Sequence, residues 1–175
     1  MPDDTATFLL TGPSAAGKST VARLLAERFA RGVHLEGDVF RRSVVAGRAD
    51  MTPEPSNEAL AQLRLRYKLA ALVADTYVDA GFTVVWDDVI AGPLLEESAA
   101  LIRSHPLHVV VLLPTMDAVR AREASRPDTG YSDWSVQQLH EIFARETPRM
   151  GHWLDNSSQS PEQTVQEILS LAARG

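Results

Sequence analysis

The chain of 175 residues contains no cysteine, and this absence excludes three kinds of chemistry. Without cysteine there is no disulfide framework, no thiolate zinc site and no cysteine nucleophile. Long apolar runs are missing too, because runs such as Val109 to Leu113 are far shorter than the roughly 18 residues that a membrane span needs. The acidic start, Met1 to Asp4, is unlike the basic start of a signal peptide. We therefore expect a cytoplasmic protein without membrane contact.

Positive charge is scarce as well. The chain has 17 lysines and arginines against 23 aspartates and glutamates, which gives a net charge of −6. A non-specific nucleic-acid binder needs the opposite balance, so nucleic acid is not the expected partner and any phosphate binding must be local. Hydrophobic residues make up 45% of the chain, close to the globular average. We expect residues 1–175 to form a single domain.

Short apolar runs alternate with longer helical patterns along the chain. The runs that predict strands are residues 7–10, 33–36, 83–86, 107–113 and 152–154. The helical patterns cover residues 19–29, 57–80, 94–103, 117–125, 135–146 and 161–173. Strands that alternate with helices are typical of a parallel sheet covered on both faces. The predicted fold class is therefore α/β, with a five-stranded parallel sheet in a three-layer α/β/α arrangement.

The strongest motif is the segment from Gly12 to Thr20, which matches G-x-x-x-x-G-K-[ST] at every fixed position. It follows an apolar strand and opens a helix, so backbone N–H groups and the positive end of the helix dipole point at one anion. We expect Lys18 to reach the β- and γ-phosphates, Ser19 to bind Mg²⁺ and Thr20 to support the α-phosphate. The residues expected to form the cradle around the phosphates are Gly12, Ser14, Ala15, Ala16 and Gly17. The motif predicts a P-loop that binds Mg·ATP, and the absence of a guanine-reading Asn-Lys-x-Asp segment favours ATP over GTP.

This P-loop, the chain length and the alternation of elements resemble the small P-loop kinases of metabolites: shikimate kinase, gluconate kinase and chloramphenicol phosphotransferase. The resemblance covers nearly the whole chain and implies a P-loop NTPase fold. It further implies a small lid at approximately residues 120–134 and acceptor-covering helices at approximately residues 39–80. The implied activity is transfer of the γ-phosphoryl group of Mg·ATP to a hydroxyl of a small-molecule acceptor, by a monomer or homodimer. The segment Val89 to Gly92 stands where shikimate kinases carry a glycine triplet, which argues against shikimate as the acceptor.

In that family the second strand ends in an acidic residue that receives the proton of the acceptor hydroxyl. This chain has Glu36-Gly37-Asp38 there, and a carboxylate at the C-terminal edge of a strand faces the ligand crevice of such a sheet. We therefore expect Asp38 to be the catalytic base, with a helix N-cap as the alternative. Arg41 and Arg42 are candidates to grip the acceptor, with a solvated surface as the alternative.

The third strand ends in Asp87 and Asp88, which is typical of a Walker B element that holds Mg²⁺. Asp87 is the first candidate for the metal and Asp88 the second, because successive strand residues point to opposite faces. Asp87 is also a candidate for acceptor contact. On the long helical pattern before this strand we interpret Arg66, with its neighbours Arg64 and Lys68, as part of a solvated face, the acceptor pocket being the alternative. The histidines, His34 among them, are interpreted as structural or surface residues.

The segment 119–127 resembles the lid entry of shikimate kinase-like enzymes. By that resemblance Arg120 packs on the adenine and Arg126 is the catalytic lid cation, with Arg122 as a competing candidate for either role. A cation delivered by a closing loop stabilises charge on the moving phosphoryl group. In the loop before the last helix, Gln159 and Pro161 are expected to flank the adenine.

Two other functions stay open at this point. A polynucleotide 5′-hydroxyl kinase or a nucleotide-sugar kinase also pairs a P-loop with an aspartate after the second strand. A non-catalytic nucleotide-binding regulator would use the same loop, with conformation rather than product as its output.

Overall fold

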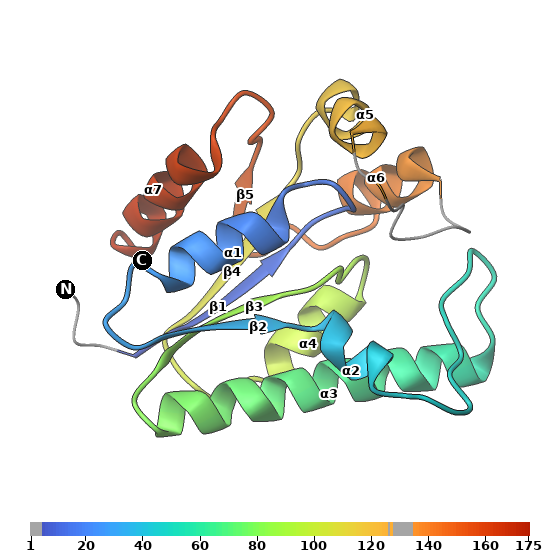
Figure 1. The fold of residues 1–175 in the computed structure, drawn as a ribbon, viewed down its shortest axis with the longest axis horizontal. Coiled ribbons are helices and arrows are strands. Elements are labelled where there is room, and N and C mark those ends of the chain that lie inside the picture. The colour runs from blue at the N-terminus through green and yellow to red at the C-terminus, as the bar shows by residue number, and fades with distance from the viewer. Residues whose placement is uncertain (1–4, 126, 128–134) are drawn as a thin grey trace.

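The computed structural model describes residues 5–125, 127 and 135–175, and in this part of the chain a five-stranded parallel sheet lies between two layers of helices (Figure 1). The strands are β1 (Thr7–Thr11), β2 (Gly32–Glu36), β3 (Thr83–Asp87), β4 (Leu107–Leu112) and β5 (His152–Leu154). The helices of the same residues are α1 (Lys18–Ala26), α2 (Asp38–Arg42), α3 (Asn57–Asp79), α4 (Leu94–Leu101), α5 (Met116–Ala124), α6 (Val136–Arg145) and α7 (Pro161–Ala172). Every predicted strand and helix is present, and among the described residues the short helix α2 is the one element that the periodicity did not predict.

The order of strands across the sheet is β2-β3-β1-β4-β5, with every pair parallel. Asp87 on β3 is in register with Leu10 on β1 and with Glu36 on β2. Because parallel strands end at the same edge, the loops that follow these three strands meet there. The phosphate loop, the segment from Glu36 to Asp38 and the Asp87–Asp88 pair therefore share one edge of the sheet.

Each face of the sheet carries its own hydrophobic core. Leu10 packs on the face covered by α1 and α7, whereas Leu9 packs on the face covered by α3 and α4 (Figure 1). Successive strand residues point to opposite faces, and both leucines are fully buried. Full burial of such a side chain contributes about 1.5–3 kcal/mol, so the two cores fix the sheet that positions the site.

Helix α3 is the longest helix of the described residues, with 23 residues. Ser56 caps it, because the Ser56 side chain accepts a hydrogen bond from the backbone N–H of Ala59. Small buried residues, Ala70 and Ala74 among them, let the helix lie close to the sheet. This close packing brings the preceding turn of α3 to the edge where the strand-end carboxylates gather.

No helix in the described part of the chain combines the length and the apolar character that crossing a bilayer requires.

Candidate active site

The loop between β1 and α1 has the backbone shape that anion binding demands. Gly12 adopts φ 151°, Gly17 adopts φ 86° and Ala15 adopts φ 60°, which are conformations that turn backbone N–H groups inward. A Cβ on Gly12 would lie 2.3 Å from the backbone oxygen of Leu112, so only glycine fits there. Lys18 Nζ donates a hydrogen bond to the Pro13 carbonyl at 2.7 Å, which folds the lysine back over the loop. The backbone of this loop thus has the conformation that the predicted P-loop requires.

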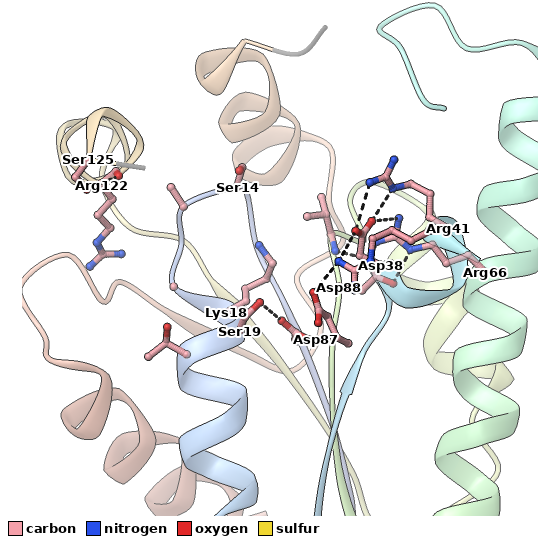
Figure 2. Close-up of a pocket in the computed structure, with 16 residues that line it drawn as sticks. Ser14, Lys18, Ser19, Asp38, Arg41, Arg66, Asp87, Asp88, Arg122 and Ser125 are labelled. Carbon is pink, nitrogen blue, oxygen red and sulfur yellow. Dashed lines mark hydrogen bonds and ion pairs between the residues drawn. The ribbon is translucent and has the colours of Figure 1, made fainter. Parts of the chain in front are cut away.

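A pocket of about 700 Å³ opens over this loop (Figure 2). On one side it is lined by the P-loop, with Lys18 and Ser19, and on the other by the charged cluster around Asp38 and Arg66. The full set of lining residues is Ser14, Ala15, Gly17, Lys18, Ser19, Thr20, Glu36, Asp38, Arg41, Arg42, Arg66, Asp87, Asp88, Val89, Arg122 and Ser125. The structure therefore brings most of the predicted site residues into one cavity.

Asp87 faces the P-loop. The Ser19 hydroxyl donates a hydrogen bond to Asp87 Oδ2 at 2.7 Å, and His34 Nε2 lies 3.0 Å from Asp87 Oδ1. His34 was expected to be a structural or surface residue, and it lies directly against this carboxylate. Mg²⁺ prefers hard oxygen ligands and is bound through one or two side chains together with substrate phosphates, so the Ser19 and Asp87 oxygens suit it.

Asp88 is turned away from the P-loop and is buried. Its carboxylate accepts hydrogen bonds from both Nε and NH2 of Arg66, the former at 3.0 Å, and from the backbone N–H of Val89 at 2.8 Å. Burial raises the pKa of the Asp88 carboxyl, and the charge and hydrogen bonds of Arg66 oppose this rise. The two neighbouring carboxylates therefore have different partners, Asp87 the P-loop serine and Asp88 an arginine of α3.

The interpretation of Arg66 as part of a solvated face was wrong. The residue is only 7% exposed, because its position on α3 faces the end of β3, where the Asp88 carboxylate compensates its charge. The partner lies 22 residues further along the chain, so no local pattern in the sequence could have found it. Glu36 and Ser125, which also line the pocket, were not predicted either.

Asp38 is the first residue of α2 and lies among three arginines. Arg41 Nε donates to Asp38 Oδ1 at 2.6 Å, Arg42 NH1 donates to Oδ2 at 3.3 Å, and Arg66 NH1 lies 3.5 Å from Oδ1. Gly37, not Asp38, is the N-cap residue of α2, and α2 has no side-chain cap hydrogen bond. Asp38 is therefore not the N-cap of this helix, which was the alternative role expected for it.

The surroundings of Asp38 determine its charge. Partial burial raises the pKa of the Asp38 carboxyl, but the hydrogen bond from Arg41 and the charges of Arg66, Arg41 and Arg42 outweigh burial and hold the pKa below its usual value. Asp38 is thus ionised at neutral pH, which is the form that accepts a proton or orients a hydroxyl.

Gly37 is needed for the close approach of these charged groups. A Cβ on this residue would lie 1.8 Å from Asp88 Oδ2, and that carboxylate is held by Arg66 and by the Val89 N–H. Gly37 has φ −63°, so alanine would bring no backbone strain and only a steric clash. We expect Gly37→Ala to lower the free energy of unfolding by about 1–3 kcal/mol, measured by urea denaturation. Unchanged stability would show that Asp88 and Arg66 shift without cost.

Arg122 is the one of the three predicted nucleotide-side arginines that lines the pocket within the described residues. Its NH2 donates to the Asn156 carbonyl at 2.8 Å and its NH1 to the Ala16 carbonyl at 3.4 Å. It therefore joins the P-loop to the loop after β5. Asn156, not singled out from the sequence, is buried and donates from Nδ2 to the same Ala16 carbonyl at 3.0 Å.

Of the other predicted adenine and lid residues, those in the described part of the chain are not among the residues that line the pocket. Arg120 is exposed on α5 and is not among the residues that line the pocket. The Gln159 side chain is hydrogen-bonded to Glu167 and Thr164, and Pro161 is the first residue of α7. Arg126 lies outside the described residues, as does most of the predicted lid. The roles given to these four residues stay predictions.

A family model described as an AAA domain matches residues 8–148. The chain belongs to this family. Comparison with curated proteins found no significant match. The AAA-domain match and the solved structures with a similar fold confirm the predicted P-loop NTPase fold.

Several of these solved structures are named as kinases, including the following three. A sugar kinase from Janibacter sp. HTCC2649 is 18% identical with a TM-score of 0.72, and the alignment covers 97% of this chain and 95% of that one. The Mycobacterium tuberculosis APS kinase CysC, in complex with AMPPNP and APS, is 19% identical with a TM-score of 0.69, covering 98% and 99%. A gluconokinase from Sinorhizobium meliloti 1021 is 19% identical with a TM-score of 0.65, covering 97% and 92%. At this identity the likeness establishes a P-loop kinase-like fold.

Proposed function

We propose that this protein is an ATP-dependent phosphotransferase that moves the γ-phosphoryl group of ATP to a hydroxyl of a small polar molecule, with Asp38 as the base. One observation carries the proposal: a single pocket joins the P-loop lysine, the Ser19–Asp87 pair and an ionised Asp38 held by arginines. A site that only bound Mg·ATP would need the first two of these features but not the third. A carboxylate across the pocket from the phosphate loop gives an acceptor hydroxyl a place to lose its proton.

The proposed reaction divides among these residues. Asp38 accepts the acceptor's proton as the acceptor oxygen forms its bond to the γ-phosphorus, and the bond to the bridging oxygen breaks with its electron pair going to ADP. Lys18 offsets negative charge on the phosphates, and the P-loop N–H groups hold them in place. Ser19 and Asp87 would hold Mg²⁺, which supplies neutralisation of phosphate charge when bound with the nucleotide.

The acceptor end of the pocket supports a small hydrophilic acceptor. Among the described residues, the lining around Asp38 consists of charged side chains with a single apolar residue, Val89. The charged residues there are Glu36, Arg41, Arg42, Arg66 and Asp88. Sites for large apolar ligands are lined mainly by hydrophobic and aromatic side chains, so this lining favours a polyol, a sugar or a sugar acid over an aromatic antibiotic. Solved structures named sugar kinase and gluconokinase fit this choice.

Two further expectations belong to the same proposal. The arginines around Asp38 are matched by acidic partners, Asp38 itself, Glu36 and Asp88, so the described residues at the acceptor end carry no excess positive charge for a polynucleotide backbone. We therefore favour a small-molecule acceptor over nucleic acid. A cytoplasmic location and a monomer or homodimer remain the predicted setting.

The test is Mg·ATP-dependent ADP release across a panel of acceptors. The panel holds sugars, sugar acids, nucleosides, a hydroxylated aromatic antibiotic and a 5′-hydroxyl oligonucleotide. We expect one of the sugars or sugar acids to raise the rate at least about a hundredfold above the background hydrolysis of ATP, a gain that acid–base catalysis by one carboxylate supplies. Stimulation by the oligonucleotide alone would identify a polynucleotide kinase instead. A flat panel together with tight ATP binding would indicate a nucleotide-binding regulator.

A further inference from the structure

Arg66 joins two carboxylates that belong to different elements. It lies on α3, and its guanidinium contacts Asp88 at the end of β3 through Nε and NH2 and Asp38 on α2 through NH1 (Figure 2). The Arg66 side chain is 8% exposed and that of Asp88 is fully buried. The planar guanidinium holds Asp88 through two hydrogen bonds and Asp38 through an ion pair, and it therefore couples the positions of the two carboxylates.

The two carboxylates are anchored very differently. Asp88 directly follows β3, an inner strand of the sheet, and its backbone N–H donates to the Leu10 carbonyl of β1 at 3.1 Å. Its side chain also accepts from the Val89 N–H. Asp38 by contrast belongs to a five-residue helix without buried residues, and its side chain is 28% exposed. The sheet therefore fixes Asp88, whereas α2 by itself gives Asp38 little support.

The other two cations at Asp38 cannot replace Arg66 in this respect. Arg41 and Arg42 lie on α2 itself, three and four residues from Asp38, so they move with it. Their side chains are 33% and 52% exposed, and each is shared with a second carboxylate, that of Asp50 for Arg41 and that of Glu36 for Arg42. Arg66 reaches Asp38 from a different element and is itself tied to the sheet.

We propose that the Arg66–Asp88 pair is a positioning device for the base, in which Arg66 transmits the fixed position of the central sheet to Asp38. The proposal rests on the proposed function, because it takes Asp38 as the base. In this proposal Arg66 acts through Asp38, because its Nε and NH2 donate to Asp88 while its NH1 lies 3.5 Å from Asp38 Oδ1. Loss of the pair would leave the base present but displaced, and a displacement of about 1 Å lowers turnover by about a hundredfold.

The charged groups that face Asp38 come from three elements. On α2 they are Arg41 and Arg42, on α3 Arg66, and behind Arg66 at the end of β3 lies Asp88; Glu36 and Asp50 lie beyond Arg42 and Arg41. Removal of Arg66 and Asp88 together takes away the positive charge that contacts Asp38 and the negative charge behind it. Because Arg66 is the nearer of the two, we expect the pKa of Asp38 to rise.

Two variants test the proposal. The double variant Arg66→Met with Asp88→Leu replaces a buried ion pair by apolar side chains, a change that is often neutral for stability. Arg66→Lys keeps the charge but loses the fork that reaches both carboxylates. The control is Arg64→Met on the same helix, because Arg64 is exposed and pairs with Glu97 away from the pocket. If the double variant does not fold, Arg66→Lys carries the test.

The first readout needs no acceptor: the Asp38 carboxyl is titrated by ¹³C NMR in each protein. We expect the titration of Asp38 to move to higher pH in the double variant, to be altered in Arg66→Lys and to be unchanged in Arg64→Met. The second readout uses the acceptor found with the panel. We expect kcat to fall about tenfold to a hundredfold in both pocket variants while the KM for Mg·ATP stays within about twofold.

An Asp38 titration and a kcat identical to those of the unaltered protein, in a folded variant, would overturn the proposal and leave the pair a structural one. A shifted Asp38 titration in a protein that phosphorylates nothing on the panel would support the positioning and count against the proposed function. Failure of the positioning proposal and failure of the proposed function therefore give different results.

Discussion

Replacing Asp38 by asparagine is expected to lower the acceptor-dependent kcat by about 10²- to 10⁴-fold, the range that a positioned acid or base contributes. Asparagine keeps the shape of the side chain but accepts no proton, and it also loses the ion pairs with Arg41 and Arg66. The P-loop is untouched by this change, so the Kd for ATP should stay within about twofold. Steady-state kinetics with the identified acceptor and calorimetric titration with ATP measure the two quantities.

Asp50→Asn is the matched control. Asp50 also accepts a hydrogen bond from Arg41, at 3.1 Å, but it is about half exposed and does not line the pocket. We expect this variant to keep kcat within about fivefold, because an exposed ion pair contributes at most about 1 kcal/mol. Equal losses in the two variants would show that Arg41, rather than Asp38, is what the reaction needs.

The pH dependence follows from the same carboxylate. The ionised form is the active one, and its pKa lies below the usual value for aspartate. Activity that depends on Asp38 is therefore present above that pKa and is lost only as the pH falls through it. Between pH 8 and about pH 5 the kcat/KM for the acceptor should show no loss from this group, since an ordinary aspartate titrates near 3.9. A titration step in kcat/KM within this range that disappears in Asp38→Asn would contradict the assignment of an ionised Asp38 as the base.

The second large effect is expected at Lys18. Its ammonium lies in the pocket at the start of α1 and donates to the Pro13 carbonyl, from which a flexible four-carbon stem lets it turn toward a phosphate. Lys18→Met should lower kcat about 10²- to 10³-fold, because it removes one preorganised charge from the developing transition state. It should also weaken ATP binding. ADP release and ATP titration measure the two effects.

Lys68→Met provides the control for Lys18. Lys68 is an exposed lysine of α3 outside the pocket, and the substitution changes the net charge by the same amount. Kinetics like those of the unaltered protein are expected. A comparable loss at Lys68 would mean that overall charge, not the position of Lys18, governs the rate.

Much of this site was already determined by local sequence. The pattern from Gly12 to Thr20 specifies a strand, a tight loop and a helix start, and the chemistry of that loop comes largely from backbone N–H groups, which any sequence with these glycines presents. Asp38 and Asp87 could be found because they follow short runs that predict strands, of which β3 is buried and β2 is half-buried. In a parallel sheet the ends of such strands meet at one edge, so the sequence alone predicts that these carboxylates lie near the P-loop.

Tertiary structure decided what depends on contacts between distant residues. Alternation along a strand predicts that Asp87 and Asp88 face different ways, but only the packed sheet shows that Asp87 meets Ser19, 68 residues away, and Asp88 meets Arg66. From the sequence Arg66 is interpreted as a surface residue, because no nearby residue in the sequence compensates its charge. Arg66 can be buried because α3 packs against the end of β3, where the Asp88 carboxylate compensates a charge that would otherwise be unpaired.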